Sequence, residues 1–271
     1  MLALDLNVGV PRPFTGSGVP SGPDGVLTTE AGDLLQSEAG QYLGFERGGG
    51  GGGSTYSVEF NGTDQYAKVG SVDTWNMLSM WVNLGTGTYR RFIGCGSGIS
   101  NRLLFFYYSG AIYAGNGTWS YTLNNGQWYH LALAVNLASG KAELYVNGVS
   151  QSQTGSTIGT ISARNQNFDI AVHDTPYVSS QTATYPGKID EIALWDTQLS
   201  AADVTSIYNS GVPNNLQSAS SYDTDRTSNL LHWWRMGDGT EAASGSTVYD
   251  EQGTADATLY NSPTFSTDVP T

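Results

Sequence analysis

The fold is decided by two adjacent stretches of sequence, QWYHLALAVN (127–136) and KAELYVNGVS (141–150). In the first stretch, large apolar side chains recur at every second position and the positions between them are uncharged, which predicts a strand covered on both faces. The second stretch alternates apolar with polar residues around Asn147-Gly148, a dipeptide that favours a type I′ turn. The two stretches therefore predict one long strand followed by a β-hairpin.

Further strands are expected on both sides of this region. Two strands joined by a Ser109-Gly110 turn are predicted in RLLFFYYSGAIYAG (102–115), and another strand is predicted in GKIDEIALWD (187–196). The 35 glycines of the 271-residue chain fit frequent tight turns. Many short strands of this kind indicate an all-β antiparallel sandwich and not an α/β fold.

One short helix is expected after the last long strand. Ser200 is a typical N-cap with Asp203 three residues later, and Leu199 is placed to pack against Val204. Gly211 supplies the residue at which we expect the helix to stop.

The charge balance excludes some classes of partner. The chain has 11 Lys and Arg against 24 Asp and Glu, a net charge of −13. Nucleic acids and anionic membrane surfaces need a basic face, so we expect neither as a partner. The surplus of carboxylates fits divalent cations, or simply solubility. Cys95 is the single cysteine, so the chain can form no internal disulfide and no cysteine-based metal site.

The N-terminal sequence does not resemble a signal peptide. MLALDLNVGVPRPF has no basic start, carries Asp5 within its short apolar stretch, and meets Pro11 and Pro13. Nowhere do 18 apolar residues follow one another, so no membrane span is expected. We therefore expect a protein made in a cytoplasm and not secreted through an N-terminal signal.

Six consecutive glycines, residues 48–53, separate two parts of different character. As a flexible coil they span roughly 13 Å. Before them lies a repeat of period eight, TTEAGDLL (28–35) and QSEAGQYL (36–43). Its apolar residues are too few to form a core: Leu34, Leu35, Tyr42, Leu43 and Phe45. We therefore expect an extended arm over 1–47 that becomes ordered against an assembly partner, with a disordered tail as the alternative, and a sandwich over 54–271.

Three ordered blocks resemble the laminin-G-like, pentraxin-related domains. They are VEFNGTDQYAKVG (58–70), QWYHLALAVNLASGKAELYVNGV (127–149) and GKIDEIALWDTQLSAADVTSIYNSG (187–211). The resemblance implies a concanavalin A-type jelly roll, an antiparallel β-sandwich with one short helix. It implies little about function, because lectins, adhesion modules and virion proteins all use this fold.

The C-terminal part departs from the family pattern. A strand and an Asp-Gly-rich loop that usually precede the first block follow the helix here, in LLHWWRMGDGT…VYDEQGTADATLYNS (230–262). Either the sheets are completed in permuted order, or this segment forms an extra pair of strands.

The WWRMGDGT ending and the arm repeat resemble bacteriophage virion proteins that carry a laminin-G-like domain. That resemblance implies a non-enzymatic protein of the virion surface, of capsid-decoration or fibre type. The arm would bind other virion proteins, the chain would form homo-oligomers, and the domain would be displayed for adhesion or glycan binding. The alternatives are a free carbohydrate-binding lectin and, less favoured, a glycoside hydrolase.

No pattern in the sequence indicates an enzyme. The three histidines are widely spaced and none lies in a motif with a nucleophile. Glycosidases on related sandwiches need two carboxyl groups that project from one strand at alternating positions. Asp190 and Glu191 are adjacent in a predicted strand, so we expect their side chains to face opposite sides.

Calcium is the metal that the sequence favours. Asn61 and Asp64 lie in an oxygen-rich turn, and the resemblance places this loop near Asp190. Asp250 is a further candidate ligand. The alternative is that Asn61 only forms a turn and Asp190 only caps a strand.

Aromatic residues beside polar loops are candidates for stacking on sugars. This set consists of Tyr113, Trp119, Tyr121, Tyr177 and Tyr185. Packing within the sandwich is the alternative for each of them.

Overall fold

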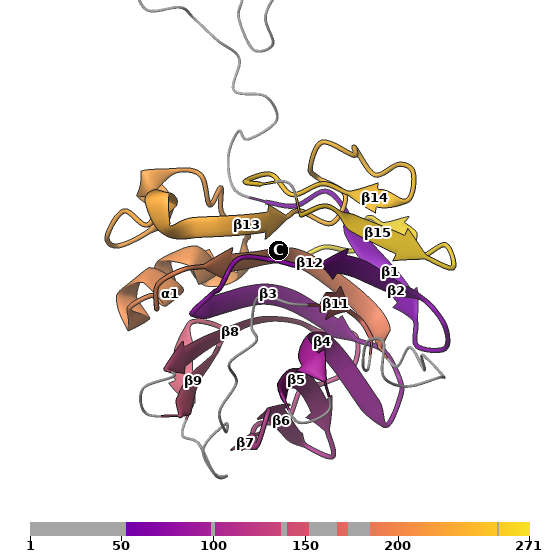
Figure 1. Cartoon of the computed structure of the whole chain (residues 1–271), viewed down its shortest axis with the longest axis horizontal. Coiled ribbons are helices and arrows are strands. Elements are labelled where there is room, and N and C mark those ends of the chain that lie inside the picture. Colours follow the sequence, from indigo (N-terminus) through magenta and orange to yellow (C-terminus); the bar gives the residue numbers. More distant parts are fainter. Residues whose placement is uncertain (1–52, 99–100, 137–139, 152–166, 173–184, 254) are drawn as a thin grey trace, which may run out of the picture. The chain divides into compact units, whose positions relative to one another are not determined.

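The computed structural model describes residues 53–98, 101–136, 140–151, 167–172, 185–253 and 255–271. These residues belong to one unit, Gly51–Thr271, while Met1–Gly50 form a separate unit outside the described residues. The predicted assembly residues Leu34, Leu35, Tyr42, Leu43 and Phe45 lie in that second unit. Figure 1 shows the described part as two curved β-sheets packed face to face.

Within the described residues each sheet has eight strands. The first sheet runs in the order β10-β9-β8-β3-β12-β1-β16, with β13 also paired to β12. It consists of β1 (Ser57–Asn61), β3 (Met77–Leu84), β8 (Trp128–Asn136), β9 (Lys141–Val146), β10 (Val149–Gln151), β12 (Pro186–Trp195), β13 (Leu230–Trp234) and β16 (Thr264–Ser266).

The second sheet runs in the order β14-β15-β2-β11-β4-β5-β6-β7. It consists of β2 (Tyr66–Gly70), β4 (Tyr89–Gly98), β5 (Asn101–Tyr108), β6 (Ala111–Ala114), β7 (Gly117–Ser120), β11 (Phe168–Ile170), β14 (Thr247–Val248) and β15 (Ala257–Tyr260). Neighbouring strands are antiparallel in both sheets. The predicted antiparallel sandwich is therefore confirmed.

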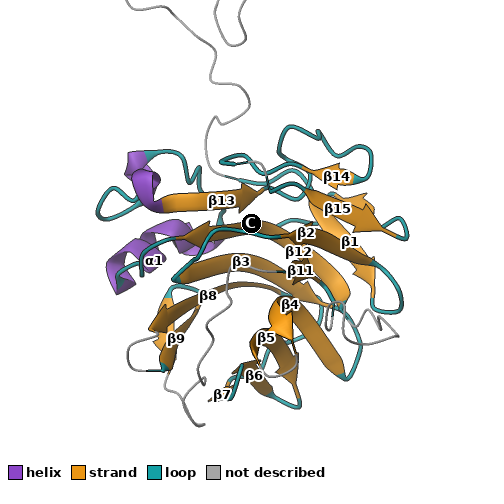
Figure 2. Ribbon diagram, in the orientation of Figure 1, coloured by secondary structure: helices purple, strands orange, loops and turns teal. Residues whose placement is uncertain are grey.

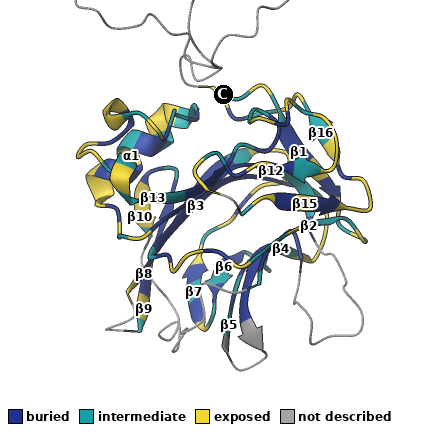
Figure 3. Cartoon of the chain, turned by 45° about the horizontal axis from the view of Figure 1, so that its top comes forward, coloured by how far each residue is buried: buried dark blue, intermediate teal, exposed yellow. Residues whose placement is uncertain are grey.

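The main core lies between the sheets. Along β8 the side chains of Tyr129, Leu131 and Leu133 point into it and are at most 3% exposed. Strands that line this core are dark blue in Figure 3, while exposed residues gather in loops and on the helix. Burial of alternate side chains from both sheets is the main favourable term for such a fold.

Both predicted hairpin turns are present. Asn147 and Gly148 have φ of 50° and 78°, and Ser109 and Gly110 have φ of 48° and 84°. Two successive residues with positive φ are what a type I′ turn requires, and its twist matches that of the flanking strands. The sequence signal for these turns is local, which is why it was reliable.

One α-helix, α1 (Ala201–Tyr208), is found among the described residues, besides three short 3-10 turns (Asn209–Gly211, Ala219–Ser221 and Thr227–Asn229). It packs on the outer face of the first sheet, at the left of Figure 2. Ser200 and Asp203 form the predicted capping box. The predicted stop at Gly211 was wrong, because Asn209 already adopts the left-handed C-cap conformation with φ of 47°.

The helix covers a second, smaller core. Its buried members come from β3, β8, β9, β12 and β13, from α1 and from the residues just before and after the helix: Met77, Ala132, Ala134, Tyr145, Ala193, Trp195, Leu199, Val204, Ile207, Leu216, Tyr222, Leu230 and Trp233. The first sheet is therefore buried on both faces over this region, as expected for the stretch at 127–136.

The C-terminal segment completes both sheets. Strand β13 pairs with β12 and β16 pairs with β1, while β15 pairs with β2 in the second sheet. Residues 230–262 therefore contribute strands to both sheets. No helix in the described residues is both long and apolar enough to cross a bilayer.

Candidate functional site

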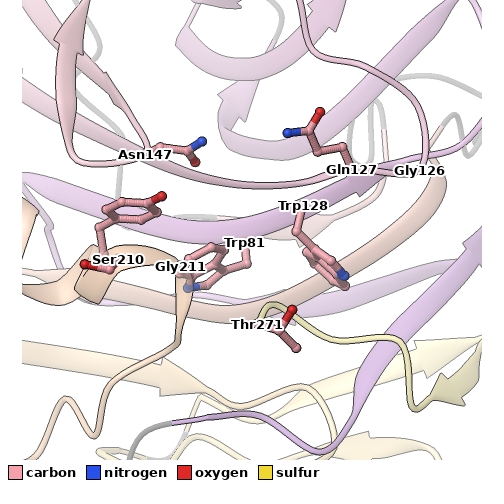
Figure 4. Close-up of a pocket in the computed structure, with 9 residues that line it drawn as sticks. Trp81, Gly126, Gln127, Trp128, Asn147, Ser210, Gly211 and Thr271 are labelled. Atoms are coloured by element: carbon pink, nitrogen blue, oxygen red, sulfur yellow. The ribbon is translucent and has the colours of Figure 1, made fainter.

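A pocket of about 390 Å³ opens on the outer face of the first sheet. It is formed between the end of α1, the turn before β8, the β9–β10 turn and the C-terminal residue, and we call it the Trp81 pocket. Nine residues line it: Trp81, Gly126, Gln127, Trp128, Asn147, Tyr208, Ser210, Gly211 and Thr271. Figure 4 shows the rings of Trp81 and Trp128 with Asn147 and Gln127 on one side and Thr271 on the other.

Trp81 forms the floor of the pocket. It lies on β3 and is opposite His130 of β8, with ring centroids 5.0 Å apart. Tyr208, the last residue of α1, lies 5.8 Å from the Trp81 ring and 6.0 Å from the His130 ring, at 29° to each. Trp81 is 4% exposed and Tyr208 is partly exposed, so the Tyr208 ring is the more accessible of the two.

The helix end is held against the β9–β10 turn. The Thr205 hydroxyl donates to the Gly148 carbonyl at 3.2 Å. A Cβ at Gly148 would lie 3.1 Å from the Tyr208 ring, and Gly148 has φ of 78°. Glycine is required here both for the turn and for the approach of Tyr208, so the turn sequence positions an aromatic wall of the pocket.

The polar side chains of the pocket are fixed through their acceptors. The Asn147 side-chain oxygen accepts from the His130 backbone N–H at 2.9 Å, and the Gln127 oxygen accepts from the Tyr129 hydroxyl at 3.0 Å. The amide NH₂ groups are therefore the atoms through which both residues can bind a ligand. Trp128 Nε1 donates to Asp268 at 3.0 Å, which orients the indole ring.

The imidazole beneath the pocket is neutral. Burial lowers the pKa of His130 to about 3, because a charged ring would lose its hydration there. Its Nδ1 is among the buried atoms without a hydrogen-bond partner. His130 therefore serves the pocket as an aromatic support and not as a proton donor or acceptor at neutral pH.

On the other side of Trp81 lies a buried pair of carboxyl groups. Asp190 is opposite Trp81 on β12, and Asp190 and Glu191 are 0% and 4% exposed. Glu191 has φ of 48°, and the register with β3 shifts between Asp190 and Ala193. The prediction that the two side chains face opposite sides was wrong, because this bulge brings both next to the Ser54 hydroxyl.

Burial favours the neutral form of both carboxyl groups of the pair, and most strongly that of Asp190. Burial raises the pKa of Asp190 well above its usual range, and the charge of Glu191 adds to this. Burial also raises the pKa of Glu191, to about 7, although Arg235 at 3.2 Å and Trp233 Nε1 at 2.6 Å favour its ionised form. Glu191 has these donors and Asp190 Oδ2 has none, so ionisation falls to Glu191.

The candidate calcium ligands lie in three places. Asn61 and Asp64 share a turn after β1, in which the Asn61 amide donates to Asp64 at 2.8 Å. Asn61 is opposite Pro186 on β12, four residues from Asp190, or about 13 Å along a strand. Asp250 instead contacts His232 Nδ1 at 2.6 Å. No cluster of three or more acidic, His or Cys side chains suited to a metal occurs in the described residues, and calcium binding stays a prediction.

Two of the candidate sugar-stacking residues are buried and cannot contact a sugar, so packing within the sandwich holds for them. Trp119 is 1% exposed and Tyr185 is 0% exposed, because both point into the core between the sheets. Tyr121 is partly exposed and packs edge-on against Tyr129, and Tyr113 is partly exposed on β6. Tyr177 lies outside the described residues.

The rings of the Trp81 pocket were missed by the sequence analysis. Trp128 was assigned only to the alternation of its strand, and Trp81 was not considered. The sequence feature that could have indicated this pocket is the position of Trp128 beside the polar turn Asn124-Asn125-Gly126. Nothing local to either tryptophan indicates that α1 ends above them.

A family model described as the concanavalin A-like lectin/glucanases superfamily matches residues 61–205. These residues are more than half of the chain. The chain belongs to this superfamily. The predicted laminin-G-like, pentraxin-like jelly roll is thereby confirmed. No curated protein sequence matches the chain.

The chain is also similar to solved structures at low sequence identity. One is a Bacteroides ovatus protein whose carbohydrate-binding role is itself an inference, with 18% identity and a TM-score of 0.59; the match covers 85% of this chain and 64% of that one. Another is the heptameric SAP-like pentraxin of Limulus polyphemus, with 15% identity, a TM-score of 0.45, and coverage of 57% and 82%. The chain thus spans about two thirds of the Bacteroides protein.

Proposed function

We propose that residues 54–271 form a glycan-binding module that acts without catalysis. The Trp81 pocket carries this proposal, because it places Trp81, Trp128 and Tyr208 beside the amides of Gln127 and Asn147. Aromatic rings can cover the apolar C–H faces of a sugar, and the amides can donate to its hydroxyl groups. A volume of about 390 Å³ is in the range of small-ligand pockets and suits a short oligosaccharide segment.

Binding without hydrolysis follows from the chemistry of the lining. The nine described residues that line the pocket offer rings, amides, hydroxyl groups and backbone, and no carboxylate side chain, imidazole or thiol. Cleavage of a glycosidic bond needs two carboxyl groups beside the bond. Asp190 and Glu191 are a close pair, but neither side chain lines the pocket. A glycoside hydrolase is therefore the weaker alternative.

The proposal is tested by measuring glycan binding with and without one pocket ring. Neutral oligosaccharides would be screened on an array, and the best ligand titrated calorimetrically against the unaltered protein and Trp128→Ala. We expect Trp128→Ala to weaken binding by about tenfold or more, roughly 1.4 kcal/mol. Tyr249→Ala, which removes an exposed ring outside the pocket, is the control and should bind normally. Equal affinity for all three proteins would remove the pocket from the proposal.

We also propose that the arm, residues 1–47, anchors the module in a larger particle, specifically a phage virion that displays it on its surface. The support is the sequence of the arm, whose apolar residues have no core of their own, and the six glycines that follow. Particles assembled with a chain that lacks 1–47 should remain intact without carrying the module. Full occupancy by that shortened chain would instead mean that the sandwich attaches itself.

A further inference from the structure

The outer side of the second sheet carries a second group of aromatic residues, far from the Trp81 pocket in the topology. Along β5 and β6 the side chains of Phe105, Tyr107 and Ile112 are buried in the core, whereas their neighbours are partly exposed. The residues on this outward side define what we call the outer aromatic face: Tyr89, Arg91, Phe106, Tyr108 and Tyr113.

The rings of this face are stacked on one another. Tyr89 and Tyr108 lie opposite each other on β4 and β5, with centroids 4.3 Å apart and planes at 8°. Phe106 and Tyr113, opposite each other on β5 and β6, are 4.8 Å apart at 7°. Phe106, Tyr108 and Tyr113 are partly exposed and Tyr89 is exposed. The face is therefore a row of partly exposed aromatic rings, three of which carry a phenol hydroxyl group.

An arginine completes the row. The Arg91 guanidinium lies 5.3 Å from the centroid of the Tyr89 ring, a cation–π distance. Tyr89 is 42% exposed, one of the few exposed large side chains in the described residues. Its hydrogen bond to Tyr108 raises the pKa of the Tyr89 hydroxyl, so this group remains neutral and protonated at neutral pH.

The surroundings of this face are basic in an otherwise acidic chain. From Thr74 to Ala142 the sequence contains no Asp or Glu, although the chain has 24 of them, and this stretch carries Arg90, Arg91 and Arg102. Strands β4 to β7 all lie within it. Asp169 of β11 also belongs to the second sheet, but it is 3% exposed and opposite Lys68. Strands β4 to β7 therefore carry arginines and no carboxylate side chain.

This combination is suited to a ligand that has both negative charge and sugar rings. An arginine and phenol hydroxyl groups can donate to a carboxylate, and the aromatic rings can contact the apolar faces of a pyranose. A nucleic acid would require a much denser array of basic residues than this face provides. An uncharged glycan would make no use of the arginine.

We propose that the outer aromatic face binds acidic glycans, chains of carboxylate-bearing sugars, and that Arg91 and Tyr89 contact the carboxylate. This site is separate from the Trp81 pocket and does not depend on it. The protein then has two binding surfaces, one on each sheet, with different preferences for charge.

The test compares two forms of one polymer. Polygalacturonate carries a carboxylate on each ring, and its fully methyl-esterified form has the same backbone without the charge. Affinity electrophoresis or calorimetry with the full chain should detect the acidic form, with affinity that falls as salt rises. Arg91→Gln should weaken this binding by about tenfold or more, and Tyr89→Ala should weaken it as well, while both variants melt normally.

Trp128→Ala serves as the matched control for location. It should leave binding of polygalacturonate unchanged, whereas Arg91→Gln should leave the ligand of the Trp81 pocket unchanged. Equal binding of the esterified polymer would overturn the proposal, as would loss of polygalacturonate binding in Trp128→Ala. Stronger binding of single-stranded RNA than of polygalacturonate, lost in Arg91→Gln, would assign the face to nucleic acid instead.

Discussion

Aromatic residues occupy the outward positions of both sheets, but α1 covers those of the first sheet and leaves those of the second open. Trp195 points outward from β12 and is 0% exposed, since the helix and the segment after it pack over it. Tyr89 points outward from β4 and is 42% exposed. The same alternation along a strand therefore gives either a second core or an exposed surface, and the presence or absence of a covering element decides which.

The largest expected effect on stability tests the difference between the covered face of the first sheet and the open face of the second. Trp195→Ala should lower the free energy of unfolding by about 3–5 kcal/mol, because it removes a fully buried ring and leaves a cavity beneath α1. Tyr113→Ala on the open face should cost less than about 1 kcal/mol. Urea denaturation of both variants measures the contrast. Similar losses would mean that the outer aromatic face is as much a core as the covered one.

The next effect concerns how α1 is held over the first sheet. Asp203 is buried and accepts from the Thr224 N–H at 2.8 Å and from Arg226 at 3.0 Å, besides capping the helix. Burial opposes ionisation, but these donors lower the pKa of Asp203. Asp203→Ala should therefore cost about 3 kcal/mol of unfolding free energy.

The control for that variant is Asp225→Ala. Asp225 is exposed and accepts hydrogen bonds from Thr227 alone in the described structure, so its loss should lower stability much less than the loss of Asp203 does. If both variants unfold at the same denaturant concentration, the anchoring of the helix does not depend on the buried carboxylate.

A smaller effect is expected in the pH dependence of stability. The pKa of Asp190 is raised in the folded state, so the fold retains a proton that the unfolded chain loses near pH 3.9. The stabilisation from this group is complete below that pH and is lost as pH rises toward the folded pKa. Asp190→Asn cannot titrate, so its melting temperature relative to the unaltered protein should increase between pH 4 and pH 8.

The titration of His130 changes stability with pH in the opposite direction. Its pKa of about 3 in the fold lies below the value of 6.5 in the unfolded chain, so its contribution is complete above pH 6.5 and is lost on acidification. It is present in both proteins and cancels in the comparison. Parallel melting profiles for the two proteins would mean that Asp190 is already ionised in the fold.

Local patterns in the sequence predicted what is local in the structure. The Asn147-Gly148 and Ser109-Gly110 turns and the Ser200–Asp203 capping box depend on a few neighbouring residues. The sandwich itself followed from alternation along each strand together with the family resemblance. Alternation shows that a strand has two faces but does not show which face turns inward, so both alternatives stayed open for Trp119 and Tyr185, which lie in the core.

The Trp81 pocket and the Asp190–Glu191 pair depend on contacts that no local sequence pattern indicates. The Trp81 pocket needs the end of α1, two turns and the C-terminal residue to meet over one strand. The Asp190–Glu191 pair needs a bulge at the point where β12 changes partner from β1 to β13. Neither arrangement leaves a local signal in the sequence. Only the polar turn before Trp128 could have indicated a surface for binding.

The smallest expected effect on stability concerns residues 53–56, which make hydrogen bonds to later parts of the chain. The Gly53 N–H donates to the Pro213 carbonyl at 2.8 Å, Ser54 donates to Glu191 at 3.2 Å, and the Tyr56 N–H donates to Asp238 at 3.1 Å. A chain that begins at Gly51 keeps all three bonds, so its unfolding free energy should stay within about 0.5 kcal/mol of the full chain. A chain that begins at Ser57 loses them and leaves the buried Glu191 without one donor, which should cost about 2 kcal/mol more. Calorimetric melts of the two chains separate these outcomes, and loss of a cooperative transition in the longer one would assign residues of the arm to the sandwich.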